Sequence, residues 1–153
     1  MAAAKPFRYG TLLRVRQRQE DAKSTALAQM RRAVRSAEEQ HREIVGQQLA
    51  AFESAAALAC EQFDASDIRR YFVYERHLSR LAVEKDAEIA HLRREEDERR
   101  SDLEEAMKRR KVLEKLKSRK DEALKYMLGQ EEQKRVDEAA VNRAAQADGP
   151  RKS

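Results

Sequence analysis

The sequence predicts an all-α protein: a long antiparallel two-helix coiled coil, or helical hairpin, with a C-terminal single-helix overhang. Its 153 residues include only 4 Gly and 2 Pro, so little interrupts helix formation. Ala, Arg, Glu, Leu and Lys account for 90 residues, a composition typical of long exposed helices. Charged residues make up 40% of the chain, which leaves enough apolar material for a narrow seam but too little for a sheet-containing core.

The positions of Gly and Pro predict one domain between two flexible tails. Pro6 and Gly10 lie near the start, and Gly149 precedes Pro150 near the end. The expected tails cover residues 1–6 and 148–153, and the expected hairpin domain covers residues 7–147.

The helices of this domain are expected to be separated near Asp64. Asp64 is a good N-cap residue, and Asp67 would place negative charge at the positive end of the second helix dipole. We therefore expect a helix over about 7–63, a turn at about 64–66 and a second helix over about 67–147.

Apolar residues in both expected helices recur at steps of three and four, the spacing of a coiled-coil seam. The first track includes two polar exceptions and runs through Leu27, Met30, Val34, Ala37, His41, Ile44, Gln48, Ala51, Ala55 and Leu58. Upstream, Leu12, Val15, Gln19, Ala22 and Ala26 keep the same rhythm but join it through consecutive steps of four, which predicts a stutter in the supercoil.

The seam of the second helix is expected to contain charged residues. Its apolar members are Leu78, Ala82, Ile89, Leu92, Leu103, Ala106, Leu113, Leu124, Met127 and Val141. They are interrupted by Lys85, Glu96, Arg99, Arg110, Lys117 and Lys120. We therefore expect modest stability.

Charge supports the antiparallel pairing. If the turn centres on Ala65, residue n of the first helix lies near residue 130 − n of the second. The acidic segment 36–67 then faces the basic segment 68–94, and the basic segment 25–35 faces the acidic segment 95–105. At the other end two basic segments meet, and their self-repulsion favours an anionic partner there or a solvated basic face.

The same pairing leaves residues beyond about 126 without a partner helix. Val136, Ala140 and Val141 would be exposed on this overhang, where they could dock onto another protein. Fraying of the overhang is the alternative.

The sequence offers no combination of residues suited to catalysis or to cofactor or metal binding. A two-helix hairpin supplies no enclosed pocket, and His41, His77 and His91 are far apart along the chain. We therefore expect no enzyme, no cofactor, no metal site and no small-molecule substrate. The single cysteine, Cys60, fits a reducing compartment, and we expect a cytosolic protein.

The few aromatic residues cluster at the start of the second expected helix. Tyr71 and Tyr74 share a helical face with Leu78 and Leu81. This face could pack against the first helix or anchor a partner protein.

The order of several segments resembles the flagellar export protein FliJ family, which includes the central stalk proteins of type III secretion. The resemblance begins at Lys5-Pro-Phe-Arg-Tyr-Gly-Thr-Leu-Leu-Arg. It continues through Asp67-Ile-Arg-Arg-Tyr-Phe-Val-Tyr74, Arg110-Lys-Val-Leu-Glu-Lys-Leu-Lys117 and Glu132-Gln-Lys-Arg-Val-Asp-Glu-Ala-Ala140. It spans nearly the whole chain.

The resemblance implies a non-enzymatic cytosolic component of the flagellar export apparatus, peripheral to the inner membrane. Such a protein enters the hexameric export ATPase, links it to the membrane export gate and is associated with export chaperones. In this family the chain termini meet at the end that enters the ATPase ring. This is also the basic end of the hairpin, which makes candidates of Arg14, Arg16, Arg18, Lys108, Arg109, Arg110 and Lys111.

The resemblance also implies contacts to the export gate on the first turns of the second helix. The matching positions are Tyr74, Leu78, Leu81 and Lys85, although the lysine departs from the family pattern. Tyr71 lies on the same face. Whether the chain serves a flagellum or an injectisome stays open.

Two other functions are compatible with the composition. A nucleic-acid-binding coiled coil would use the same basic end, but its basic stretches lack interleaved aromatic residues and acids recur among them. We therefore expect no nucleic acid partner. A generic helical scaffold or chaperone-like hairpin is the other alternative.

Overall fold

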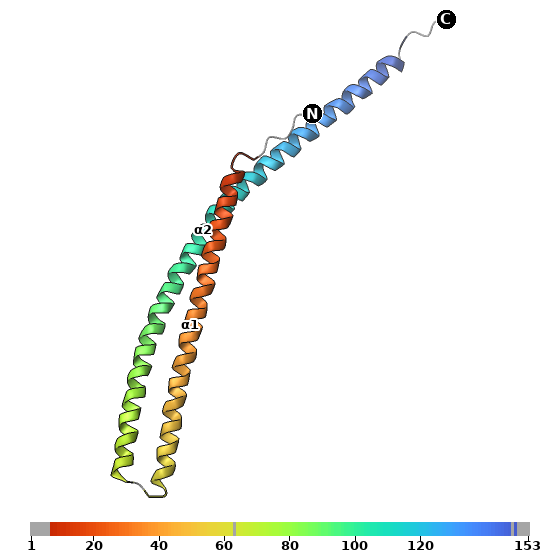
Figure 1. Cartoon of the computed structure of the whole chain (residues 1–153). Helices are drawn as coiled ribbons and strands as arrows, with labels where there is room; N and C mark the ends of the chain where they lie inside the picture. The colour runs from red at the N-terminus through yellow and green to blue at the C-terminus, as the bar shows by residue number, and fades with distance from the viewer. Residues whose placement is uncertain (1–6, 63, 148, 150–153) are drawn as a thin grey trace. The chain divides into compact units, whose positions relative to one another are not determined.

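The computed structural model describes residues 7–62, 64–147 and 149. These residues form two helices and no strand: α1 (Gly10–Ala59) and α2 (Ala65–Ala147). The helices pack against each other as an antiparallel hairpin (Figure 1). The predicted all-α hairpin fold is confirmed.

The chain divides into two compact units, each of which contains part of both helices. The turn unit covers residues 18–107. The terminal unit consists of residues 1–17 and 108–153, of which the structure describes 7–17, 108–147 and 149.

The helix ends differ by a few residues from the expected ends. α1 begins at Gly10 rather than at about residue 7, because the Gly10 amide donates to the Phe7 carbonyl in a tight turn. α1 ends at Ala59 rather than at about residue 63, where two short i to i+3 bonds close the helix: Cys60 N–H to Ala57 O and Glu61 N–H to Leu58 O. Phe63 and the expected tails, Gly149 excepted, lie outside the described residues.

α2 begins directly after Asp64. The Asp64 carbonyl accepts the amides of Asp67 and Ile68, as an N-cap carbonyl does. Its carboxylate accepts the Ser66 hydroxyl at 2.9 Å. Asp67 lies in the first turn, where its negative charge favours the helix dipole.

Burial along α1 follows one track of three- and four-residue steps, with a gap between Glu20 and Leu27, where Lys23 is exposed. The residues that are buried or half-buried on this track are Leu13, Arg16, Glu20, Leu27, Met30, Val34, Ala37, His41, Ile44, Gln48, Ala51 and Ala55. The expected track is therefore correct from Leu27 onward, except that Leu58 is exposed. The predicted stutter near the start of α1 is wrong. Leu12 and Val15 are 40% and 42% exposed, and their neighbours Leu13 and Arg16 occupy the positions that face α2.

Two of the three charged residues expected on the α2 seam of the turn unit, Lys85 and Glu96, are half-buried and have partners, whereas Arg99 is exposed. Lys85 is half-buried, and its Nζ donates to Gln40 Oε1 at 2.9 Å and pairs with Glu88. Glu96 accepts from Arg31 Nε at 3.1 Å and lies 3.5 Å from an Arg100 nitrogen. Among the described residues, no buried side-chain polar atom lacks a hydrogen-bond partner.

Contacts between the helices fix the register of the turn unit. The contacting pairs are Lys23–Asp102, Arg31–Glu96, Glu38–Arg93, Gln40–Lys85, His41–Asp86 and Gln48–Ser79. The two residue numbers of each pair add up to between 125 and 131, with 127 recurring three times. The expected sum of 130 is thus close, and the small difference means that the hairpin turns slightly before Ala65.

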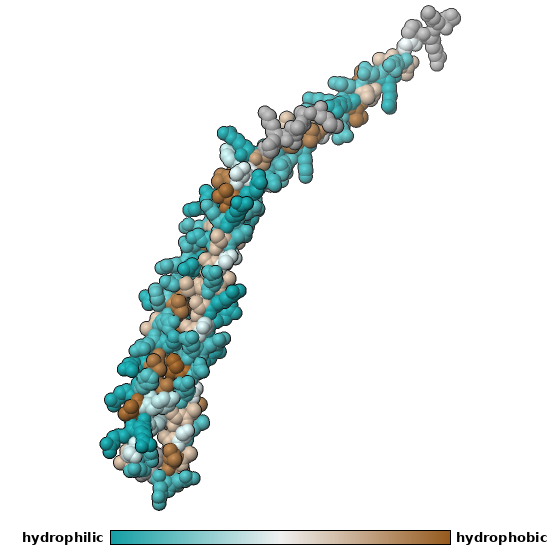
Figure 2. Space-filling view, in the orientation of Figure 1, coloured by the Kyte–Doolittle hydropathy of each residue, from teal (hydrophilic) through white to brown (hydrophobic). Residues whose placement is uncertain are grey.

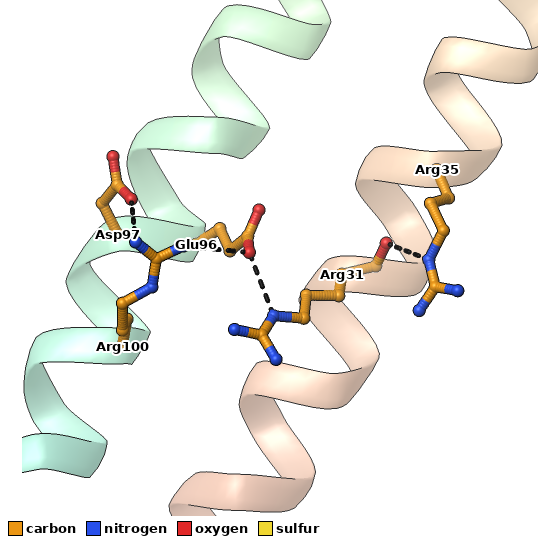
Figure 3. A network of polar contacts seen from close by, with 5 residues as sticks. All are labelled: Arg31, Arg35, Glu96, Asp97 and Arg100. Atoms are coloured by element: carbon orange, nitrogen blue, oxygen red, sulfur yellow. Dashed lines mark hydrogen bonds and ion pairs between the residues drawn. The ribbon is translucent and has the colours of Figure 1, made fainter.

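The acidic run at 95–98 is accounted for by this register. Arg31 of α1 and Arg100 of α2 both lie beside Glu96, and Arg100 also pairs with Asp97 at 3.6 Å (Figure 3). Arg35 turns back to the Arg31 carbonyl. The cluster is an ion-pair network between the two helices.

In the terminal unit, the first turns of α1 pack beside α2 and the rest of α2 is exposed. Leu13 is buried here, at 8% exposure. The described residues from 115 to 147 are all exposed, including Leu124, Met127 and Val141, which were expected on the seam. Leu13 and Gln17 of α1 still line an open groove with α2 residues as far along as Lys125. Beyond Lys125, no described residue of α1 lies opposite α2.

We predict that Leu78→Ala lowers the free energy of unfolding by about 2–4 kcal/mol, because Leu78 is the most deeply buried side chain, at 2% exposure, and its truncation leaves a cavity in the seam. Val83→Ala, at a position 68% exposed, should change it by less than about 0.5 kcal/mol. Urea denaturation followed by circular dichroism measures both. Equal losses in the two variants would contradict this description of the seam.

Candidate partner-binding surfaces

An open apolar groove lies between the helices near the turn. α1 and α2 each contribute four residues to it: Ala51, Ser54, Ala55 and Leu58, and Asp67, Arg70, Tyr71 and Tyr74. Tyr71 is half-buried and packs edge-on against Phe72, with ring centroids 5.4 Å apart. Tyr74 is 46% exposed, so its ring is available at the groove. Asp67 and Arg70 form a weak ion pair at its edge, 3.8 Å apart.

The other three residues expected to contact the export gate differ in accessibility. Leu78 is buried in the seam and does not reach the surface. Leu81 is half-buried, and Lys85 is half-buried and engaged with Gln40 and Glu88. Tyr74 therefore offers the largest accessible surface of the predicted gate-binding residues, whereas Leu78 holds the helices together.

The terminal unit concentrates positive charge. Residues 7–17 and 108–125 together carry 12 Lys and Arg against 3 Asp and Glu. Arg14, Lys108, Arg109 and Lys111 are exposed. This surface attracts an anionic partner over distances of roughly 8–10 Å at physiological salt.

Other basic residues of the terminal unit are tied into local contacts. The Arg110 guanidinium pairs with Glu114 and is half-buried, as is Arg16. Lys120 Nζ lies 5.8 Å from the centroid of the Phe7 ring. Arg18, the remaining candidate for ATPase binding, is exposed but belongs to the turn unit.

The overhang presents the apolar residues expected there. Val136 and Val141 are 57% and 66% exposed, and Ala140 is exposed. Hydrogen bonds between neighbouring turns, such as Gln133 Nε2 to Asp137 Oδ1 at 2.9 Å, support the helix locally.

Three exposed apolar residues of α1 lie outside every surface expected from the sequence. Val45, Leu49 and Phe52 are 45%, 59% and 59% exposed. Their spacing of four and then three residues places them on one face, and this spacing away from the seam is the sequence signal that identifies them.

Among the described residues, no group of His, Cys, Asp and Glu is arranged to hold a metal ion. His41 Nε2 lies 3.1 Å from Asp86 Oδ1, and His91 lies 3.6 Å from Glu95. Cys60 is exposed. Neither described helix is long and apolar enough to cross a membrane.

Comparison with known proteins gives one family match. The family model described as "Flagellar FliJ protein" matches residues 5–149. No curated protein and no solved structure matches the chain. Because the match covers nearly the whole sequence and the fold is a two-helix hairpin, the chain belongs to the flagellar FliJ protein family.

Proposed function

We propose that this protein is the non-enzymatic central stalk of the flagellar export apparatus. Family membership makes it a component of that apparatus. The finer proposal is that the terminal unit binds the hexameric export ATPase and that the groove near the turn binds the cytoplasmic part of the membrane export gate. Association with the membrane would then be peripheral, through the gate.

The charge of the terminal unit is the observation that carries the ATPase proposal. A net excess of nine positive charges over residues 7–17 and 108–125 disfavours close packing of the two helix segments unless an anionic surface lies nearby. An acidic lining of the ATPase ring would supply that surface. Exposed Lys108 and Lys111 are the residues best suited to meet it.

The groove near the turn supports the gate proposal. Its apolar lining and the exposed Tyr74 ring form a compact anchor, and aromatic residues commonly dominate binding energy at protein interfaces. The groove and the basic surface belong to different units of the chain. Each could therefore be changed without altering the other.

The stalk would act through unequal contacts with the ATPase subunits. A hairpin presents different side chains in different directions, so it cannot contact six equivalent subunits identically. Differential contact energy shifts the equilibrium between conformations of each subunit. Such a stalk can promote ring assembly or order the hydrolysis steps, and export chaperones could engage the remaining surface.

We predict that the purified protein raises the hydrolysis rate of its cognate export ATPase, because it would stabilise the assembled ring. Phosphate release and sedimentation of the ATPase, each with increasing amounts of this protein, measure rate and assembly. If saturating protein changes neither quantity, the stalk proposal fails.

We predict that Lys108→Glu combined with Lys111→Glu weakens ATPase binding about 10-fold or more, because it replaces two attractive charges with repulsive ones. The matched control is Arg69→Glu with Arg76→Glu, which makes the same charge change in the turn unit. Titration calorimetry at low and high salt measures both. Equal weakening would refute the assignment, and binding of DNA with a steep salt dependence would favour the nucleic-acid alternative instead.

We predict that Tyr74→Asp weakens binding to the cytoplasmic part of the export gate about 10-fold or more while leaving stimulation of the ATPase unchanged. The change places a charge in the apolar groove, and Tyr74 is exposed enough for the hairpin to tolerate it. Gln130→Asp, at an exposed position of the terminal unit, is the control. Gate binding that is insensitive to Tyr74→Asp would move the gate contact elsewhere.

A further inference from the structure

The exposed apolar face of α1 belongs neither to the groove near the turn nor to the basic surface of the terminal unit. Val45, Leu49 and Phe52 follow one another along about two helical turns, roughly 10 Å. All three keep 45–59% of their surface exposed. Figure 2 shows apolar patches set among hydrophilic side chains on the visible face of the turn unit. A row of large apolar side chains on an otherwise charged helix is a feature of docking sites.

This face lies on a different side of the hairpin from the Tyr74 groove. Val45 and Phe52 follow Glu38 by 7 and 14 residues, so they continue the row of α1 that pairs with Arg93. On α1 the groove is lined instead by Ala51 and Ala55, which lie on the seam, and by Ser54, which lies on the other side of the seam from Phe52. A partner bound at one side would leave the other side open.

α2 adds an aromatic ring to the same side. Arg93, Asp86 and Ser79 are spaced by seven residues and contact Glu38, His41 and Gln48 of α1 respectively. The next position in this row toward the turn is Phe72, which is 57% exposed. This row of α2 therefore changes from polar residues to an aromatic residue as it approaches the turn. The row of α1 changes in the same way, from Glu38 to Val45 and Phe52.

Positive charge borders this apolar surface on α2. Residues 68–83 contain four arginines and a single acid, Glu75, which is half-buried and accepts the Ser79 hydroxyl. Arg69, Arg76 and Arg80 are exposed, and no described carboxylate pairs with them. Arg80 contacts the ring of His77, at 3.3 Å.

We propose that these residues form a second docking surface, the Phe52 surface, that binds an acidic amphipathic helix of a partner protein. It is defined by Val45, Leu49, Phe52 and Phe72 with Arg69, Arg76 and Arg80. Apolar side chains of the partner, spaced at i, i+4 and i+7, cover the apolar residues. Carboxylates on its flank accept charge-assisted hydrogen bonds from the three guanidinium groups.

The positive charge of the three arginines favours an acidic helix over a basic or a neutral one. A basic helix would meet three arginines of like charge, and like-charge contacts at an interface are costly. A neutral apolar helix would cover the arginines without providing acceptors for them, which leaves polar groups desolvated. The arginines from 69 to 80 span about 16 Å, so a helix of three to four turns reaches all of them.

Two synthetic peptides test this proposal with the full-length protein. Both carry the same leucine face at i, i+4, i+7 and i+11, and they differ in having Glu or Lys on the flanks. Fluorescence anisotropy of the labelled peptides measures binding. We expect the Glu peptide to bind about 10-fold or more tightly than the Lys peptide, with an affinity that falls as salt is added. Equal binding of both peptides, or binding of neither, would overturn the proposal.

Substitutions locate the site on the protein. Phe52→Asp should weaken binding of the Glu peptide about 10- to 30-fold, whereas Phe52→Leu should retain most of it. Gln47→Asp is the matched control, since Gln47 is exposed on the same turns of α1 but outside the row of Glu38 and Phe52. Circular dichroism confirms that each variant keeps its helix content. Equal effects of Phe52→Asp and Gln47→Asp would refute the site.

Two further measurements distinguish the Phe52 surface from the Tyr74 groove and from a contact between two copies of the chain. Tyr74→Asp should leave binding of the Glu peptide unchanged. A failure of the Phe52-surface proposal can therefore be distinguished from a failure of the gate proposal. Analytical ultracentrifugation compares the wild type with Phe52→Asp. If the wild type self-associates through Phe52, a second copy covers this face, and the acidic-helix proposal is wrong.

Discussion

The narrow seam between α1 and α2 is the constraint on which the rest of the turn unit depends. Every third or fourth residue of α1, from Leu27 to Ala55, faces α2, and only a few of these are large apolar residues. Burial alone would hold such a seam weakly. The ion pairs Arg31–Glu96 and Glu38–Arg93 add little stability in water but disfavour other registers, since a shifted helix would bring like charges together. The seam brings the helices together, and the charges align them.

A seam this narrow leaves most of each helix free to serve other purposes. In a globular domain the residues that bind partners compete with the core for apolar side chains. Here the Tyr74 groove, the Phe52 surface and the basic residues of the terminal unit all lie outside the seam or at its edge. Different sides and different units can therefore carry different binding chemistry on only two helices.

The fold could be predicted because helix period, charge pattern and the scarcity of Gly and Pro all agree. The predicted pairing of the basic segment 25–35 with the acidic segment 95–105 is correct for this reason, as the Arg31–Glu96 contact shows. The inner positions at the start of α1 could not be predicted from hydrophobicity. Leu12 and Val15 look as suitable as Leu13 and Arg16, and only the continuous heptad from Leu27 backward selects the latter pair. The sequence also could not predict which residues of one face are accessible to a partner. Leu78 and Tyr74 share a face by their spacing, but Leu78 is 2% exposed and Tyr74 is 46% exposed.

The exposed part of α2 beyond the first turn of α1 has a kinetic consequence. Residues 126–147 form about six turns of helix without lateral packing, and most of the stability of helices in proteins comes from such packing. This segment should exchange its amide protons much faster than residues near Leu78 and Ile89, which are protected by the seam. A partner that binds this segment would have to order it, and that entropic cost lowers the affinity gained for each unit of surface buried.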